Sequence, residues 1–121
     1  MRIGNDIVYM PRVRQMFERK GIPERIYTDK EIEHINNLKL DVRKVERMAG
    51  KYAVKEAVVK AMGTGIGEIA LNDIEVLAER GGKPVVRLYN KAKEIFDSKY
   101  SEIDISIAHD GEYAYAVCVM N

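Results

Sequence analysis

The stretch KYAVKEAVVKAMGTGIG, residues 51–67, decides how the rest of this chain can fold. On a helical wheel at about 100° per residue, Lys51 and Lys55 fall between two methionines, so the charged side chains share no polar face. A helix that is apolar on nearly every side is normally buried, and an ionised carboxylate such as Glu56 is costly to bury unless a cation or hydrogen bonds compensate it. The stretch therefore predicts a buried central helix carrying a carboxylate that needs a partner.

The composition of the chain narrows its class. Its 121 residues, 46% of them hydrophobic, predict one domain over residues 1–121 with a substantial core. Twenty basic and nineteen acidic residues give a net charge of +1, which excludes a general polycation. Cys118 is the only cysteine, so a disulfide within the chain is excluded and a reducing compartment is favoured. Without a signal-like segment or a run of roughly 18 apolar residues, we expect a soluble cytoplasmic protein.

The first half of the chain predicts one short strand, residues 2–8, followed by helices. Four signals mark the helix ends: Pro11 at a start, Gly21 at an end, Thr28 with Glu31 as a capping box, and Asp41 as the cap of the long helix. The long helix should end at Met62, where Gly63 follows.

The second half predicts two β-hairpins separated by a short helix at about residues 90–100. DIEVLAE and PVVRL flank a glycine turn, and IDISIAH and EYAYAVCVM flank Asp110-Gly111, a strong hairpin signal. A two-residue turn at Asp110-Gly111 gives three pairs: Ile107 with Ala114, Ile105 with Ala116, and Ile103 with Cys118. We therefore expect an α+β fold in which an antiparallel sheet packs against the long central helix.

Four features have both a structural and a functional interpretation. Glu56 either forms an i,i+4 pair with Lys60 or binds a hard dication such as Mg²⁺, with Asp6 as the second acid. The glycine-rich loop 63–67 either caps the long helix or cradles phosphate. His109, beside the hairpin turn, is either a surface histidine or part of a site. None of these features is specific when taken alone.

Together they carry a resemblance to a known family. The motifs are IGNDIV near the start, AGKYAVKEAVVKAMGTGIG in the middle, DIEV followed by GGKP, and SIAH followed by EYA. In their order and spacing, the chain resembles the small 4′-phosphopantetheinyl transferases of the holo-acyl-carrier-protein synthase type over nearly its whole length. The resemblance implies transfer of phosphopantetheine from coenzyme A to a serine of an acyl carrier protein. It also implies release of adenosine 3′,5′-bisphosphate, a requirement for Mg²⁺, a role in fatty acid biosynthesis, and a homotrimer with active sites at the subunit interfaces.

The same resemblance implies roles for individual residues. Asp6 and Glu56 become the Mg²⁺ ligands, and Lys60 joins them as the third catalytic residue. The residues implied to bind coenzyme A are Lys51, Lys55, Gly63, Thr64, Gly65, Lys83, Pro84 and His109. The residues implied to dock the acidic carrier protein are Arg12, Arg14, Arg19 and Arg25, for which a solubilising surface is the alternative. Three candidates remain for the base that deprotonates the serine: Glu56, Asp6 and a water held near Asp6. We favour the water.

The chain departs from the family pattern at four positions. Tyr9 stands where a glutamate is usual, Lys51 replaces a frequent arginine, Tyr52 replaces a Trp or Phe, and Ala108 replaces a Ser or Thr. The alternative function is a small non-enzymatic α+β module that binds nucleic acid through its basic first helix. The low net charge and the absence of tryptophan disfavour that function, and the intact Asp6, Glu56 and Lys60 disfavour an inactive structural oligomer.

Overall fold

The computed structural model describes residues 1–65 and 67–121. Its elements, in chain order, are β1 (Arg2–Tyr9), α1 (Met10–Lys20), α2 (Asp29–Asn36), α3 (Asp41–Met62), the 3-10 helix η1 (Leu71–Asp73), β2 (Ile74–Ala78), β3 (Pro84–Leu88), α4 (Asn90–Lys99), β4 (Ile103–Asp110) and β5 (Tyr113–Met120). Two antiparallel sheets form, one in the order β1-β5-β4 and one of β2 and β3. The expected α+β class with an antiparallel sheet on a long helix is confirmed.

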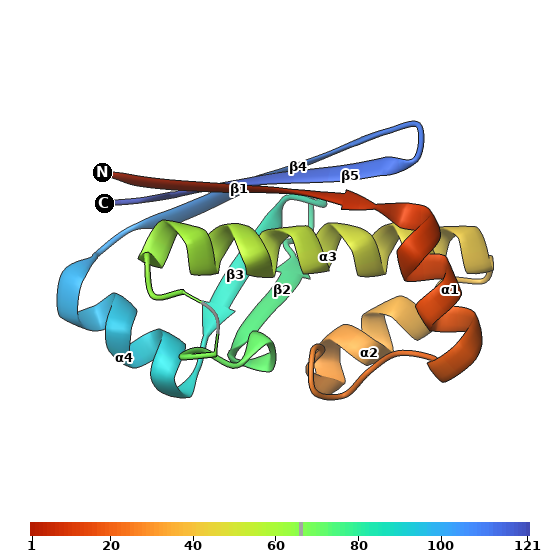
Figure 1. Ribbon diagram of the computed structural model, residues 1–121, viewed down its shortest axis with the longest axis horizontal. Helices are drawn as coiled ribbons and strands as arrows, with labels where there is room; N and C mark the ends of the chain where they lie inside the picture. The colour runs from red at the N-terminus through yellow and green to blue at the C-terminus, as the bar shows by residue number, and fades with distance from the viewer. Residues whose placement is uncertain (66) are drawn as a thin grey trace.

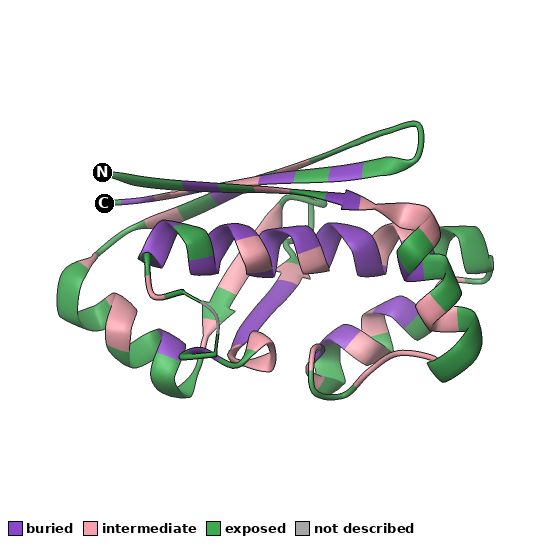
Figure 2. Cartoon of the chain, viewed as in Figure 1, coloured by how far each residue is buried: buried purple, intermediate pink, exposed green. Residues whose placement is uncertain are grey.

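The long helix α3 is the centre of the molecule. It runs beneath the three-stranded sheet, with β2, β3 and α2 on its other side (Figure 1). Because it is covered from several directions, most of its residues are buried (Figure 2), and Val54, Ala57 and Val58 expose nothing. The helix that the sequence marked as apolar on nearly every side is thus the core helix of the fold.

Gly4 lets β1 lie directly on α3. A Cβ atom at this position would stand 2.1 Å from the carbonyl oxygen of Ala57 and 2.6 Å from the backbone nitrogen of Ala61. Both atoms belong to the helix backbone, which cannot move aside as a flexible side chain can. The glycine therefore sets the spacing between strand and helix at the point where Asp6, two residues further along the same strand face, meets α3.

The register of the β4–β5 hairpin corrects the sequence prediction. Ile107 pairs with Ala116 and Ile105 with Cys118, because the turn residues are Gly111 and Glu112 rather than Asp110 and Gly111. The register extends further because Tyr113 is paired on both sides, with Asp110 and with Tyr9 of β1. The error is a shift of two residues, so the same side chains still face the helix.

The helix ends follow the sequence signals with one exception. Thr28 and Glu31 form the predicted capping box of α2, with both reciprocal hydrogen bonds present. Asp41 is not the cap of α3, because Leu40 occupies that position without a side-chain hydrogen bond and Asp41 is the first helical residue. There its negative charge still interacts favourably with the helix dipole. Within residues 1–65 and 67–121, no helix combines the length and apolar character needed to cross a membrane.

Candidate functional site

Asp6 and Lys60 meet between β1 and α3. Lys60 Nζ donates a hydrogen bond of 3.1 Å to Asp6 Oδ1, and the Asp6 side chain is 17% exposed whereas that of Lys60 is 53% exposed. Lys60 forms no ion pair with Glu56 in the part of the chain that the structure describes. The i,i+4 interpretation of Glu56 is therefore wrong, and Glu56 keeps its carboxylate available.

Glu56 and Asp6 line one cavity of about 600 Å³, which we call the carboxylate cavity. Its other walls are largely apolar and come from the end of β1, from α1 and from the segment before α2; they include Val8, Val13, Met16 and Ile26. The two carboxylates thus come from elements that are fifty residues apart in sequence but packed together in the core. Acidic oxygens beside an apolar wall are suited to hold a charged group at one end and an aliphatic group along the other.

Tyr52 lines the same cavity one turn before Glu56 on α3. Its partial burial, and then the neighbouring Glu56 carboxylate, raise the pKa of the Tyr52 phenol above its ordinary value. The hydroxyl therefore stays protonated and remains a hydrogen-bond donor beside the carboxylate. This donor is present because the chain has tyrosine where the family pattern usually has Trp or Phe.

The two carboxylates fit Mg²⁺. This ion takes only one or two carboxylates from a protein and fills its other positions with water and phosphate oxygens. Across residues 1–65 and 67–121, no cluster of three or more His, Cys, Asp or Glu side chains forms a closed cage for a metal. The donor set of Asp6 and Glu56 therefore suits a hard dication that shares its coordination with a phosphorylated substrate.

A second cavity, of about 300 Å³, lies on another side of α3 and is lined by basic side chains. We call it the basic cavity and define it by His34, Arg47, Lys51, Pro84 and His109. His109 reaches α3 from β4, with Nε2 3.2 Å from the carbonyl oxygen of Glu46. The sequence prediction placed Lys51, Pro84 and His109 at one nucleotide site, and the structure brings these three together.

Neither His34 nor Arg47 was predicted from the sequence to belong to the site. Arg47 Nη1 lies 2.5 Å from His34 Nε2, and Lys51 Nζ lies 3.1 Å from His34 Nδ1 and also donates to the Val76 carbonyl oxygen. The i,i+4 spacing of Arg47 and Lys51 on α3 was a usable signal, whereas the approach of His34 from α2 depends on tertiary packing. Burial, aided by the neighbouring cations, lowers the pKa of His34 to about 4 and that of Lys51 to about 8.

Lys55, which was assigned to coenzyme A binding from the sequence, lies in the core and lines neither the carboxylate cavity nor the basic cavity. Its side chain is fully buried, and Nζ donates to Glu31 Oε1 at 2.7 Å, to the Leu71 carbonyl oxygen at 3.0 Å and to the Ile74 carbonyl oxygen. These contacts occupy all three donors of the ammonium group. Glu31 in turn accepts from the backbone nitrogen of Val76 at 3.0 Å. Lys55 and Glu31 therefore join α2, α3 and β2 inside the core.

The loop after α3 begins with a helix cap. Gly63 has a φ of 71° and its N–H bonds back to the Val59 and Lys60 carbonyl oxygens, so the structural interpretation of this glycine holds. Thr64 Oγ1 is buried without a hydrogen-bond partner among the described residues. Gly65 also has a positive φ, of 77°, and the part of the loop at residue 66 lies outside the described residues.

Lys83 is not brought into the basic cavity. It lies 3.7 Å from Asp104 in an exposed ion pair and lines a separate cavity of about 560 Å³ between β3 and β4. Pro84 lines both cavities. Pro84 therefore shares a cavity with Lys51 and His109, whereas Lys83 does not.

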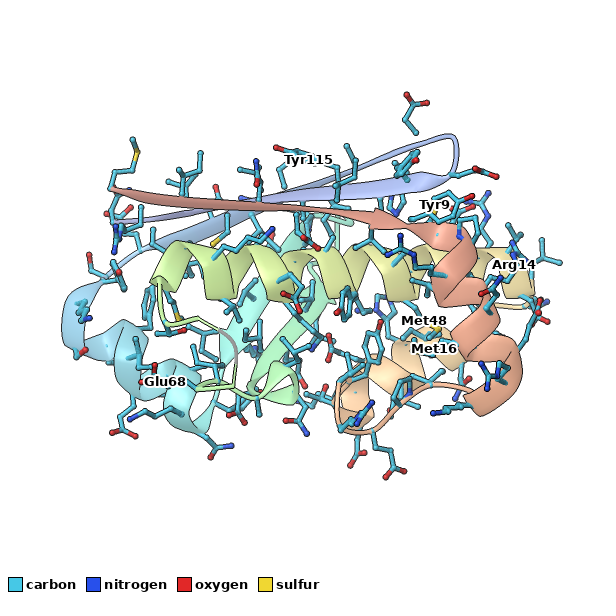
Figure 3. The ribbon with its side chains drawn as sticks, in the orientation of Figure 1. Tyr9, Arg14, Met16, Met48, Glu68 and Tyr115 are labelled. Carbon is cyan, nitrogen blue, oxygen red and sulfur yellow. The ribbon has the colours of Figure 1, made fainter. Side chains whose placement is uncertain are left out.

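The four arginines expected to dock a carrier protein are all exposed: Arg12, Arg14 and Arg19 on α1, and Arg25 in the following segment. Arg14 lies beside α1 at the end of the molecule where α3 begins (Figure 3), and it lines a small cavity with Val42 and Gly111. Arg12 lines the carboxylate cavity, and its guanidinium lies over the Tyr9 ring, 5.9 Å from the ring centroid. Tyr9 thus supports Arg12 by a cation–π contact where a glutamate would have given an ion pair.

The outer face of the three-stranded sheet is exposed and apolar. Ile3, Ile7, Tyr113 and Tyr115 are exposed to between 40% and 67%, and Tyr115 projects on the side of the sheet away from α3 (Figure 3). Ala108 pairs with Tyr115 and lies on this outer face, next to an inward-facing His109. The missing hydroxyl at Ala108 therefore changes the sheet surface rather than the basic cavity of the same chain.

A family comparison agrees with this geometry. The model of the 4′-phosphopantetheinyl transferase superfamily matches residues 2–118. The chain belongs to this family. The holo-acyl-carrier-protein synthase of Fusobacterium nucleatum is 38% identical over 120 residues, covering 98% of this chain and 96% of that protein. That of Ruminiclostridium cellulolyticum is 40% identical over 125 residues, covering 100% and 92%.

Solved structures of the family have the same fold. The Helicobacter pylori holo-acyl-carrier-protein synthase in complex with coenzyme A has a TM-score of 0.83 at 32% identity, covering 98% of this chain and 99% of that chain. The Neisseria meningitidis enzyme has a TM-score of 0.87 at 26% identity, covering 99% and 97%. The family and the transferase class expected from the motifs are confirmed, and the nucleic-acid-binding alternative loses its support.

Proposed function

We infer that this phosphopantetheinyl transferase is a holo-acyl-carrier-protein synthase acting in fatty acid biosynthesis in the cytoplasm. It transfers 4′-phosphopantetheine from coenzyme A to a serine of an apo acyl carrier protein and releases adenosine 3′,5′-bisphosphate. The observation that carries this proposal is that Asp6 and Glu56 line one cavity, with Lys60 bonded to Asp6, in a member of the family. The full-length match to relatives of that name, and the coenzyme A bound to the Helicobacter pylori protein, support it.

The pyrophosphate of coenzyme A is expected at Asp6, Glu56 and Lys60, where the two carboxylates would hold Mg²⁺. When bound, the ion supplies charge neutralisation on the phosphate oxygens. Lys60 adds a mobile ammonium group, since 53% of its side chain is exposed and its partner Asp6 lies 3.1 Å away. Thr64 has a buried hydroxyl that lacks a partner among the described residues, and a phosphate oxygen would accept its hydrogen bond.

In the transfer step, the carrier serine oxygen attacks the β-phosphorus of coenzyme A. The bond from that phosphorus to the bridging oxygen breaks, and the electron pair leaves with adenosine 3′,5′-bisphosphate while the serine proton passes to a base. Lys60 offsets negative charge that develops on the phosphate oxygens. Asp6 and Glu56 fix the polar end of the carboxylate cavity, and its apolar wall leaves room for the pantetheine chain. The identity of the base stays open between Asp6, Glu56 and a water near Asp6.

The nucleotide end of coenzyme A is expected in the basic cavity, at Lys51 and His109 beside Pro84. This cavity and the carboxylate cavity share no lining residue. We therefore propose a homotrimer in which one subunit supplies the carboxylates and its neighbour supplies the basic side chains. The exposed apolar sheet face at Ile3, Ile7 and Tyr115 supports subunit contact, because monomeric proteins rarely leave such a patch uncovered.

The carrier protein is expected to dock on α1. Arg12, Arg14, Arg19 and Arg25 offer exposed positive charge to an acidic partner, and Arg12 stands at the carboxylate cavity itself. A carrier bound there would present its serine beside Asp6 and Glu56.

Product analysis tests the reaction. The protein is incubated with coenzyme A, Mg²⁺ and an apo carrier protein, and adenosine 3′,5′-bisphosphate is quantified by chromatography. We expect one bisphosphate for each carrier molecule, and no product from a carrier whose acceptor serine is replaced by alanine. Bisphosphate released without a carrier, or none released with it, would contradict the proposed function.

A further inference from the structure

A chain of three nitrogen-bearing side chains crosses the basic cavity from α3 to α2 and back. Arg47 Nη1 lies 2.5 Å from His34 Nε2, and His34 Nδ1 lies 3.1 Å from Lys51 Nζ. A guanidinium group only donates hydrogen bonds, so His34 Nε2 must be the acceptor. A neutral imidazole with an acceptor at Nε2 carries its proton on Nδ1. The N–H at Nδ1 therefore points at Lys51.

The contact between His34 and Lys51 depends on the charge of Lys51. An ammonium group has no lone pair, so a protonated Lys51 would set one donor against another at 3.1 Å. A neutral amine accepts the hydrogen bond from His34 Nδ1 and still donates to the carbonyl oxygen of Val76. Every hydrogen bond in the row Arg47–His34–Lys51 therefore has one donor and one acceptor when Lys51 is neutral.

The surroundings of Lys51 agree with this geometry. Its side chain is only 4% exposed, and burial lowers the pKa of its amine to about 8, with Arg47 and Lys55 on the same helix adding to the effect. Two carboxylates oppose it, Glu31 from α2 and Glu75 from β2.

Both opposing carboxylates have other partners. Glu31 is paired with Lys55 at 2.7 Å, and Glu75 accepts hydrogen bonds from the Thr28 and Tyr89 hydroxyls. The remaining titratable groups at the cavity are His109 from β4 and Glu46 on α3. The Glu46 carboxylate also has a cation partner, since it lies 3.9 Å from the Arg43 guanidinium. No carboxylate in the described surroundings is therefore dedicated to holding a proton on Lys51.

We propose that His34 is a positioning residue that makes the basic cavity bind a phosphate group together with a proton. The proposal rests on the nucleotide site proposed above. When the phosphate enters, Arg47 turns from His34 Nε2 to the phosphate, and Lys51 takes one proton from solvent. The imidazole proton moves from Nδ1 to Nε2, so that Nδ1 accepts a hydrogen bond from the new ammonium group. The net change is one proton gained by the protein.

Calorimetry with adenosine 3′,5′-bisphosphate as the probe tests this coupling. The full-length protein is titrated at pH 8 in buffers of different ionisation enthalpy, and the slope of binding enthalpy against buffer enthalpy gives the number of protons taken up. Because burial lowers the pKa of Lys51 to about 8, a substantial fraction of this amine is neutral at pH 8, and we expect uptake of a fraction of a proton, roughly one half, per site. The phosphates, with a second pKa near 6, contribute none at this pH.

Two variants and one control isolate the source of the proton. The arginine in Lys51→Arg is permanently charged, so this variant should bind the bisphosphate without the proton uptake that Lys51 contributes. His34→Gln offers an amide oxygen to the Lys51 ammonium, so it should also bind with little uptake. Lys93→Arg, on the exposed face of α4 and paired with Asp97, should match the wild-type protein.

Each outcome decides one part of the account. Bisphosphate binding with no uptake by the wild-type protein, or equal uptake by His34→Gln, would overturn the proton coupling and leave the nucleotide site intact. No binding at any pH from 6 to 9 would overturn the nucleotide site and the coupling with it. Nitrogen-15 NMR of the imidazole adds a direct readout: we expect the His34 proton on Nδ1 in the free protein at pH 9, where Lys51 is mostly neutral, and on Nε2 in the complex. A proton on Nε2 in the free protein at pH 9 would contradict the mechanism.

Discussion

Lys60 reaches from α3 across to Asp6 on β1, with 3.1 Å between Nζ and Oδ1, although Glu56 lies one turn away on its own helix. This choice of partner leaves the two carboxylates at one cavity with only one of them neutralised. A carboxylate with no cation partner beside an apolar wall is costly unless a ligand compensates it. The arrangement is therefore suited to a dication bound to a pyrophosphate: the dication compensates the carboxylates, and the pyrophosphate supplies its remaining oxygen ligands.

The closeness of β1 to α3 predicts a large effect of one methyl group. Gly4→Ala places Cβ against the helix backbone at Ala57, and we expect a loss of at least about 2 kcal/mol in the free energy of unfolding. Gly81→Ala is the matched control, since nothing lies within 4 Å of a Cβ there; it should change stability by less than about 0.5 kcal/mol. Urea unfolding measures both. Equal stabilities of the two variants would show that β1 does not lie on α3 as described.

The buried ion pair predicts a stability effect rather than a ligand effect for Lys55. Lys55→Met leaves Glu31 as a buried carboxylate without its cation, and we expect a loss of about 3–5 kcal/mol. The double variant Lys55→Met with Glu31→Gln removes the stranded charge and should recover part of that loss. Urea unfolding of the three proteins measures the coupling. A Lys55→Met protein of wild-type stability with weakened coenzyme A binding would return Lys55 to the nucleotide site.

His34 predicts how stability depends on pH. Its pKa is about 4 in the folded protein and 6.5 as the ordinary value. Between those values the unfolded chain binds a proton that the folded chain does not, so the free energy of unfolding falls as the pH drops from 6.5 to 4. His34→Gln should show a smaller fall over the same window, with the remainder due to carboxylates. Thermal unfolding at half-unit pH steps compares the two proteins, and parallel curves would contradict the folded-state pKa of His34.

The sequence predicted the fold better than it predicted the site. Periodicity and turn residues suffice for β1, α3 and both hairpins, because each signal is local. The hairpin register was wrong because Tyr113 is held by β1 as well as β4, a non-local effect. The burial of Lys55 was not predicted because its partner Glu31 lies twenty-four residues away on α2. His34 joins Lys51 only through tertiary packing, so no motif in the sequence indicates it.

The position of Arg12 predicts a selective effect on the carrier protein. Arg12→Glu replaces attraction by repulsion at an exposed site beside the carboxylate cavity, so the KM for the carrier should rise at least about tenfold, or roughly 1.4 kcal/mol. The KM for coenzyme A should change little, and Lys91→Glu on α4 should leave both constants unchanged. Steady-state kinetics with each substrate varied in turn measures this. Equal effects of Arg12→Glu on both substrates, or on neither, would make α1 a solubilising surface.

The intact mass of an apo carrier protein after incubation with coenzyme A and Mg²⁺ tests the central claim most directly. With the wild-type enzyme, we expect the carrier mass to rise by one phosphopantetheine. Circular dichroism should show that Glu56→Gln and Asp6→Asn are folded. With either variant the rate should fall at least about 100-fold, which corresponds to roughly 2.7 kcal/mol of activation free energy. Glu94→Gln on the exposed face of α4 should keep the wild-type rate. An unmodified carrier with the wild-type enzyme, or near-normal modification by both carboxylate variants, would contradict the account.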